Sequence, residues 1–385
     1  MERVGGLEWA DLIRKVFSPG PRDRAMAFLV DLPDGRAPDR PEWAARRAMA
    51  GEWRDSLEAF EAELGLETRL FVYRNTGAGN AELPERAWEH RGGALPASAD
   101  ELDPARSLPF AEAFTACSIL VAPTQFSATA PLKILARRYG FRAVTMPGFD
   151  ESMIPALRLD YGVVMRRCVF LKELLERSVE ARIDFLVDGS EPRRLVLDLR
   201  HRSAHASGGL VPEPGTTGNL PSGEAYIAPY EGELSGDASR SAGDLPVQLG
   251  DEVVVYRIEA NRAVEASGPG AAAAAEAGKL RREPAYGNIA ELGLGVLADL
   301  GIGPVGKTLL DEKLGLHIGF GRSDHLGGSV GPSAFSSREA ATHLDRVYVP
   351  AMQDRVRVAA ADLVGPDGSV TPLMRDGAYA LSFTP

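Results

Sequence analysis

The sequence is poor in cysteine and in long apolar runs, and each shortage excludes a class of protein. Cys117 and Cys168 are its only cysteines, and both lie in apolar runs, which indicates small core residues rather than a disulfide framework. No run approaches the roughly 18 consecutive apolar residues of a membrane-spanning helix. The opening stretch MERVGGLEWADLIRK has acidic residues where a signal peptide has a basic flank, so we expect a cytoplasmic protein with no membrane partner.

The sequence also lacks a concentration of positive charge. Its 43 Lys and Arg residues are outnumbered by 54 Asp and Glu residues, which gives a formal net charge of -11, and the basic residues are scattered along the chain. Binding to a phosphate backbone requires concentrated Lys and Arg, so we expect no nucleic-acid partner. With 44% hydrophobic and 25% charged residues, the composition is that of a globular protein, and 385 residues suffice for two domains.

The pattern of apolar residues divides the chain into two parts. Through residues 1–180, short β-type runs such as AMAFLVDL and SILVAP alternate with helical patterns, which predicts an α/β domain with a Rossmann-like layered sheet. No G-x-G-x-x-G motif follows the first strand pattern, so a dinucleotide site is not indicated. Residues 181–385 contain short strand patterns between Gly- and Pro-rich turns, which predicts a mainly antiparallel, β-rich α+β domain. The stretch 206–223 is too long for a hairpin turn, and such loops often shape a site.

Side chains that can bind a metal occur in four segments of the second domain, three of which contain glycine. They are Glu224 in NLPSGEAYIAPY, Glu291 in GNIAELGLG, His317 in LGLHIGFG, and His343 with Asp345 in THLDRVYVP. A strand aims residues two apart at the same place, and glycine lets a backbone approach a ligand closely. Each residue taken alone is explained as well by a structural hydrogen bond, but together they supply two imidazoles and three carboxylates.

This set of donors has the composition of a site for two divalent ions. Three carboxylates bring a charge of -3 against the +4 of two ions, so about one positive charge remains and favours a bridging hydroxide over neutral water. Nitrogen and oxygen donors without a thiol suit Zn, Mn or Co and do not choose among them. The sequence therefore predicts two divalent metal ions as cofactors.

The order of these segments is similar to that of a known family. NLPSGE, AELGLG, DEKLGLHIGFG and H-x-D, within residues 219–345, resemble the aminopeptidase T and aminopeptidase S family of two-metal, leucyl aminopeptidase-like peptidases. The resemblance implies a metallo-aminopeptidase in which a metal-activated water hydrolyses N-terminal peptide bonds or a related small amide. It also implies a homodimer with a peptide or small-amide substrate. The implied metal ligands are Glu224, Glu291, His317, His343 and Asp345, and Glu224 is in addition a candidate catalytic residue.

One position departs from the family pattern. The family places a catalytic tyrosine seven residues after the histidine of H-I-x-x-G, whereas this chain has Asp324 there, followed by His325. His325 is then either a catalytic donor to the tetrahedral intermediate or an exposed polar loop residue. Tyr226 and Tyr348 are further candidates for that task. Lys313 either orients substrate or a ligand carboxylate, or is a solvated lysine in a turn.

Two other functions remain open on the same residues. His317, His343 and Asp345 alone make a 2-His-1-carboxylate set, which suits Fe(II) oxygen chemistry. Ring-cleaving pyridine dioxygenases resemble this peptidase family, so a mononuclear iron enzyme is the alternative. The presence of Glu224 and Glu291 as well favours two ions. A non-catalytic descendant that retains the metal site is the third reading.

Two further motifs do not support a site in their sequence context. GIGPVGKT, residues 301–308, fits the phosphate-loop pattern, but Gly315 interrupts the following helix pattern and Pro304 removes one amide from the proposed cradle. HRSAH places His201 and His205 four residues apart, but it ends a β-type run and lacks the Glu of H-E-x-x-H. We therefore expect no nucleotide site, and a loop or surface role for this histidine pair.

Overall fold

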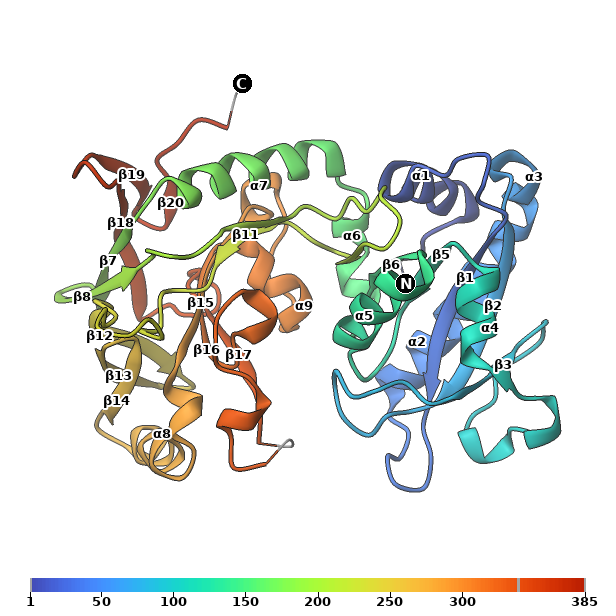
Figure 1. The fold of residues 1–385 in the computed structure, drawn as a ribbon, viewed down its shortest axis with the longest axis horizontal. Coiled ribbons are helices and arrows are strands. Elements are labelled where there is room, and N and C mark those ends of the chain that lie inside the picture. The colour runs from blue at the N-terminus through green and yellow to red at the C-terminus, as the bar shows by residue number, and fades with distance from the viewer. Residues whose placement is uncertain (1, 338–339, 384–385) are drawn as a thin grey trace. The chain divides into compact units, whose positions relative to one another are not determined.

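The computed structural model describes residues 2–337 and 340–383 (Figure 1). The chain divides into two compact units, of which the first comprises Met1–Met165 and Ser207–Ser222 and the second Arg166–Ala206 and Gly223–Pro385. By this division the boundary lies inside the long helix α7, Tyr161–Glu176, whereas the sequence pattern placed it after residue 180. The Gly- and Pro-rich stretch predicted as a loop of the second domain belongs largely to the first unit.

The first unit contains one sheet with a parallel core. Its strand order is β10-β6-β5-β1-β2-β3-β4, in which neighbours from β10 to β2 are parallel and the pairs of β3 with β2 and with β4 are antiparallel. The strands are β1 Ala25–Leu32, β2 Glu67–Arg74, β3 Arg86–Glu89, β4 Leu108–Pro109, β5 Ile119–Ala122, β6 Arg142–Thr145 and β10 Thr217–Asn219. The helices are α1 Gly6–Phe17, α2 Pro41–Leu57, α3 Glu61–Leu64, α4 Phe110–Ala116, α5 Thr129–Tyr139 and α6 Ile154–Leu157, followed by α7 Tyr161–Glu176. The strand β10 belongs to the segment Ser207–Ser222, so this later part of the chain adds the edge strand of the sheet.

Helices cover both faces of β1, which explains why the whole strand is buried. On one face, the ring of Phe28 lies 5.5 Å from that of Trp9 in α1 and 6.0 Å from that of Trp53 in α2. On the other face, Leu29 belongs to a core cluster that includes Phe114 of α4 and Leu132 of α5. Alternate residues of the strand thus enter different cores, as a continuous apolar run in a parallel sheet requires.

The second unit is built mainly from two sheets. One has the order β17-β16-β15-β11-β9, and the other has the order β14-β13-β12-β8-β7-β18-β19-β20. The first sheet comprises β9 His205–Ser207, β11 Glu224–Ile227, β15 Ile289–Gly295, β16 Leu316–Gly321 and β17 His343–Val347. The second comprises β7 Glu180–Val187, β8 Glu191–Asp198, β12 Ala242–Leu249, β13 Glu252–Glu259, β14 Arg262–Ser267, β18 Val356–Val364, β19 Val370–Arg375 and β20 Ala378–Tyr379. The remaining helices are α8 Ala271–Arg282 and α9 Thr308–Asp311. An α/β part is therefore combined with a β-rich part, as predicted.

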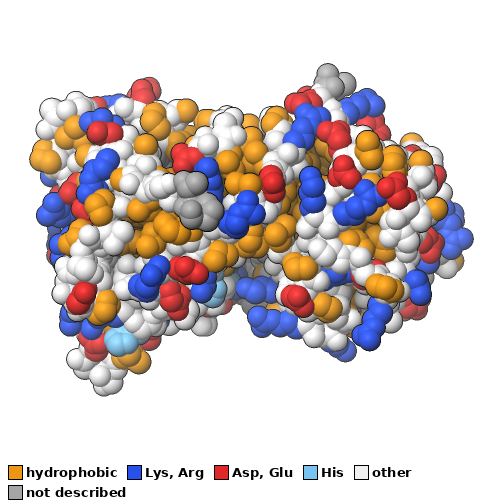
Figure 2. All heavy atoms as spheres, turned by 90° about the horizontal axis from the view of Figure 1, so that it is seen from above, with side chains coloured by type: hydrophobic (Ala, Val, Ile, Leu, Met, Phe, Trp, Pro, Cys, Tyr) orange, Lys and Arg blue, Asp and Glu red, His pale blue; other side chains and the backbone are white. Residues whose placement is uncertain are grey.

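Cys117 and Cys168 are buried, and neither forms a disulfide. None of the helices in the described ranges has the length and apolar character that a membrane crossing requires. On the face drawn in Figure 2, basic and acidic side chains are interspersed.

The octet of residues 301–308, which fits the phosphate-loop pattern, lies mostly in a segment without regular secondary structure. Gly301 ends a short 3-10 helix, and the helix that follows the octet, α9, has only four residues. The amide of Val305 donates to Asp311 Oδ1 at 2.8 Å, so it is used within the loop. This context lacks the strand and the long helix that a phosphate loop requires.

Candidate metal centre

The five predicted donors lie on one face of the five-stranded sheet. The pairs β11 with β15, β15 with β16 and β16 with β17 are antiparallel, so residues opposite each other share a face. One row across the sheet places Tyr226 opposite Gly293, Gly293 opposite His317 and His317 opposite Val347. Residues two positions away along each strand lie on the same face. That face carries Glu224, Glu291, His317, His343 and Asp345, whereas Leu292, Ile318 and Phe320 point to the other side.

Glycines on the same face provide the space that the donors occupy. A Cβ at Gly293 would lie 1.9 Å from His317 Nε2, and a Cβ at Gly319 would lie 2.8 Å from both Glu291 Cβ and His343 Cε1. Heavy atoms cannot approach so closely, so a larger residue at either position would displace a donor. The alternation of donor and glycine in AELGLG and HIGFG thus has a steric cause, because the imidazoles and carboxylates lie over the neighbouring backbone.

The donors form two groups of three that share Glu291. Within residues 2–337 and 340–383, Glu224, Glu291 and His317 bring one ligand atom each within 4.8 Å of one another, and so do Glu291, His343 and Asp345. His317 Nε2 lies 3.4 Å from Glu224 Oε2 and 3.5 Å from Glu291 Oε1. His343 Nε2 lies 3.1 Å from Glu291 Oε2 and from Asp345 Oδ1.

These separations fit donors that share a metal ion. Nitrogen and oxygen donors about 2.1 Å from a four-coordinate ion lie about 3.4 Å from one another. Each oxygen of Glu291 lies near a different imidazole, which is the geometry of a carboxylate that bridges two ions. Glu224 Oε2 is buried and has no hydrogen-bond partner in the described part of the chain, so it is an acceptor whose desolvation a cation would offset.

Backbone carbonyls fix the orientation of both imidazoles. The Nδ1 of His317 lies 3.2 Å from the carbonyl oxygen of Gly315, and the Nδ1 of His343 lies 2.7 Å from that of Arg322. Because a carbonyl only accepts, Nδ1 donates in each case and the Nε2 atom points into the cluster. Metal-bound histidines are held in the same way.

The electrostatics of the cluster favour cations. Burial opposes protonation of His317, but Glu291 and Glu224 outweigh it and raise its pKa to about 9. Burial likewise opposes protonation of His343, yet Asp345 and Glu291 raise its pKa well above the usual value. Burial opposes ionisation of Glu291, but hydrogen bonds with the two histidines hold its pKa well below the usual range. In the metal-free protein, protonated imidazoles therefore partly neutralise the carboxylates, at the positions where metal ions would bind.

A buried lysine adjoins the cluster. Lys313 Nζ donates to Glu224 Oε1 and to Glu312 Oε1, both at 2.5 Å. The sequence analysis identified Lys313 as a candidate residue but did not identify Glu312. Their adjacency in the DEK triplet before the HIGFG segment was the available signal, although a surface turn has the same appearance. The solvated-turn reading of Lys313 is wrong, because its side chain is only 2% exposed.

His325 lies beside the donors without belonging to either group. Its ring is 5.1 Å from that of His343 in an edge-to-face arrangement, and its side chain is 38% exposed. Burial, and then the charge of His343, lower the pKa of His325 to about 4, so its imidazole is neutral near pH 7. Asp324, at the position of the family tyrosine, is held by Arg322 through a 2.5 Å bond from Nε to Oδ1.

The two tyrosine candidates differ in their surroundings. Tyr348 is buried and donates its hydroxyl to the carbonyl of Pro246 at 2.8 Å, so its hydroxyl is committed to the backbone of β12. Tyr226 shares the donor face, and burial followed by the charges of Glu291 and Glu224 raises its pKa. Of the two, Tyr226 is the tyrosine that faces the cluster.

The histidines of HRSAH have separate surroundings. His201 Nε2 lies 3.0 Å from Asp237 Oδ2, so this partly exposed histidine is held by a hydrogen bond at the surface. His205 is exposed at the start of β9, and its ring lies 5.2 Å from that of Tyr226. The surface role expected for the pair fits both, with the addition that His205 neighbours the donor face.

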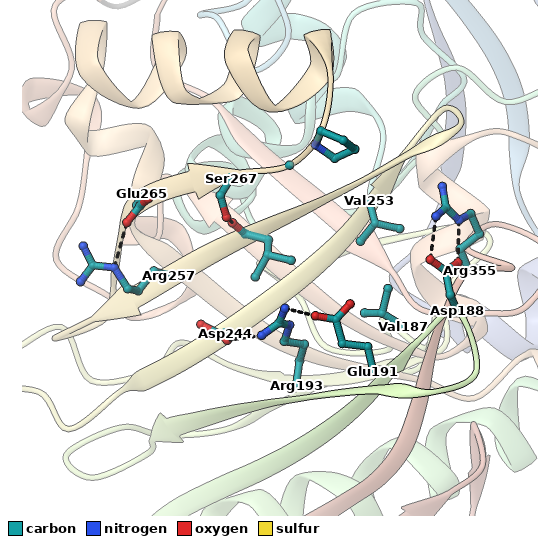
Figure 3. A pocket seen from close by; sticks show the side chains of 13 residues that line it. Val187, Asp188, Glu191, Arg193, Asp244, Val253, Arg257, Glu265, Ser267 and Arg355 are labelled. Carbon is teal, nitrogen blue, oxygen red and sulfur yellow. Dashed lines mark hydrogen bonds and ion pairs between the residues drawn. The ribbon is translucent and has the colours of Figure 1, made fainter.

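A hollow of about 420 Å³ lies elsewhere in the second unit, on the eight-stranded sheet (Figure 3). Its lining includes three arginines, each paired with a carboxylate. The pairs are Arg193 with Asp244, Arg257 with Glu265 and Arg355 with Asp188. None of the five donors lines this hollow. Each of its arginines is already paired within the protein, so we place the chemistry at the donor cluster.

Comparisons with known proteins support the fold. No protein-family model and no curated protein matches the sequence. The chain is similar to the structure of 2,5-dihydroxypyridine dioxygenase from Pseudomonas putida KT2440, with a TM-score of 0.61, 14% identity and coverage of 98% of this chain and 99% of that one. It is also similar to wild-type AmpT from Thermus thermophilus, with a TM-score of 0.57, 16% identity and coverage of 98% and 99%. At these identities the likeness extends to the fold, and an aminopeptidase and a dioxygenase both have it.

Proposed function

We propose that the chain is a two-metal aminopeptidase that hydrolyses N-terminal peptide bonds or a related small amide. The observation that carries the proposal is the position of Glu291, which belongs to both donor groups and directs one oxygen towards each imidazole. Glu224, Glu291 and His317 would hold one ion, and Glu291, His343 and Asp345 the other. When bound, such ions supply a Lewis acid for the scissile carbonyl and lower the pKa of a water between them.

The residues around the donors would complete the catalytic site. One backbone carbonyl holds each imidazole with Nε2 directed into the donor cluster, where it would bind an ion once its proton has left. His325, neutral near pH 7, would donate a hydrogen bond to the oxyanion of the tetrahedral intermediate in place of the family tyrosine. Tyr226, on the donor face, is the second candidate for that task.

A mononuclear Fe(II) dioxygenase is the alternative, and the fold of this chain is equally compatible with it. Its 2-His-1-carboxylate set would be His317, His343 and Asp345, which are divided between the two donor groups. Glu291, which lies beside both imidazoles, would then be a buried carboxylate with no metal ion to bind, which is costly. The donor geometry therefore supports hydrolysis over oxygen chemistry.

A screen of aminoacyl anilides with added Zn²⁺, Mn²⁺ or Co²⁺ tests the proposal. We expect turnover that depends on the added ion and stops when a chelator removes it. Metal-dependent consumption of O₂ with dihydroxypyridines, and no anilide hydrolysis, would favour the dioxygenase. Retention of two ions with neither activity would favour a non-catalytic metal-binding protein.

A further inference from the structure

Lys313 is a charged side chain placed almost entirely inside the protein. It lies in the short 3-10 helix Glu312–Leu314, directly before β16, and its side chain is 2% exposed. A buried ammonium is tolerated only when it is paired and hydrogen-bonded. Here it has two carboxylate partners, Glu224 and Glu312, each 2.5 Å from Nζ.

The backbone of Lys313 is fixed against the strand that neighbours Glu224. The carbonyl of Lys313 accepts a hydrogen bond from the amide of Leu297 at 2.9 Å. Gly295 lies opposite Glu224 in the sheet, and a Cβ at Gly295 would lie 2.2 Å from the carbonyl carbon of Lys313. The lysine therefore approaches Glu224 from a rigid position, made available by a glycine.

This contact decides which oxygen of Glu224 faces the donor group. Oε1 accepts from Lys313, whereas Oε2 lies 3.4 Å from His317 Nε2 and has no hydrogen-bond partner in the described ranges. With one oxygen held, the carboxylate cannot rotate to present both. Partners of this kind orient the ligands of metal sites.

We infer that Lys313 is a positioning residue that holds Glu224 as a one-oxygen metal ligand, and that Glu312 is the second acceptor that fixes the lysine beside it. The inference rests on the proposed two-metal function. Glu312 is partly exposed, with a side chain 15% accessible.

The test measures binding of Co²⁺ alone to the full chain after removal of any resident metal. Calorimetry gives the affinity and number of ions, and the visible absorption of Co²⁺ reports the coordination of each. Lys313→Met is expected to lower the affinity for the ion held by Glu224, Glu291 and His317 by about 10- to 100-fold. The affinity for the other ion should stay within about threefold of the wild-type value. Lys313→Arg keeps the charge and the donors and is expected to restore most of the affinity.

The matched control is Arg355→Met, which removes a cation paired with Asp188 on the other sheet and is expected to bind both ions normally. A lysine that only competed with the ion for Glu224 would, once removed, leave tighter binding. Unchanged or tighter binding by Lys313→Met therefore overturns the inference. If thermal unfolding shows that Lys313→Met does not fold, Lys313→Gln replaces it with the same expectation.

The wild-type stoichiometry separates this inference from the proposed function. A single ion per wild-type chain would contradict the two-metal proposal. The inference then stands only if that ion is weakened both by Glu224→Gln and by Lys313→Met. Retention of the ion by either variant overturns it.

Discussion

Gly293 and His317 lie opposite each other on adjacent strands, and the imidazole covers the glycine so closely that a methyl group would lie 1.9 Å from Nε2. The glycine is therefore part of the candidate metal centre although it has no side chain. The same applies to Gly319, which makes room for Glu291 and His343. The donor geometry depends on these absences of a side chain as much as on the donors themselves.

Gly293→Ala is expected to weaken binding of the ion that His317 would hold by more than about 100-fold, which exceeds the loss of an outer-shell partner. The added methyl group must displace the imidazole of His317. The overall fold should be preserved, because many other contacts stabilise it. Gly303→Ala is the matched control, because a Cβ there meets nothing within 4 Å. Calorimetric titration with Zn²⁺ checks the prediction, and equal affinities for the two variants would contradict it.

Replacement of the shared carboxylate is expected to affect both ions. Glu291→Gln removes a charge from each donor group. It should weaken the binding of both ions by more than about 100-fold and lower turnover as well. Glu224→Gln removes a donor from one group only, so the ion near His343 should remain. Metal analysis after dialysis distinguishes the two variants. Loss of the same number of ions from both would show that Glu291 does not bridge.

Metal binding is expected to strengthen as the pH rises towards 9. His317 has a pKa of about 9 in the metal-free protein, because Glu291 and Glu224 outweigh the effect of burial. Its proton must leave before Nε2 can bind an ion, so the affinity should rise up to about tenfold per pH unit between about pH 6.5 and 9. Calorimetry in buffers of different ionisation enthalpy measures the proton released. Affinity independent of pH over this range would contradict the prediction.

The stability of the metal-free protein should change in the opposite direction. A histidine whose pKa is higher in the folded state than in the unfolded state stabilises the fold fully below about pH 6.5, and this contribution is lost as the pH rises through about 9. Metal-free protein should therefore unfold more readily at pH 9 than at pH 6.5. His317→Gln should reduce that difference, as denaturant titration at the two pH values will measure.

His325 is expected to act in the chemical step and not in metal binding. His325→Phe should lower kcat by about 10²- to 10³-fold, the usual cost of removing one oxyanion donor, with two ions still bound. Tyr226→Phe in parallel tests the neighbouring candidate on the donor face. Unchanged turnover of aminoacyl anilides by His325→Phe would remove this residue from the mechanism.

The sequence predicted the features of the site that depend only on the local geometry of a strand. The alternation of Glu224, Glu291 and His317 with apolar neighbours predicted strand faces, and a sheet necessarily places such faces in register. That His343 and Asp345 share a face followed from their spacing. These inferences needed only the period of a strand, which is a local property of the chain.

Other features depend on contacts between distant segments, which the sequence does not encode locally. The bridging position of Glu291 follows from the order of β15 between β11 and β16. The burial of Lys313 requires Glu224, 89 residues away along the chain, to accept a hydrogen bond from its ammonium group. The assignment of residues 207–222 to the first unit depends on the pairing of β10 with β6.

Metal content is the most direct test of the two-metal centre. Protein purified without chelators and without added metal should contain two divalent ions of Zn, Mn or Co per chain by mass spectrometry, and Glu291→Gln purified in parallel should contain none. One iron per chain in the wild-type protein, retained when Glu224 and Glu291 are both replaced, would contradict the account.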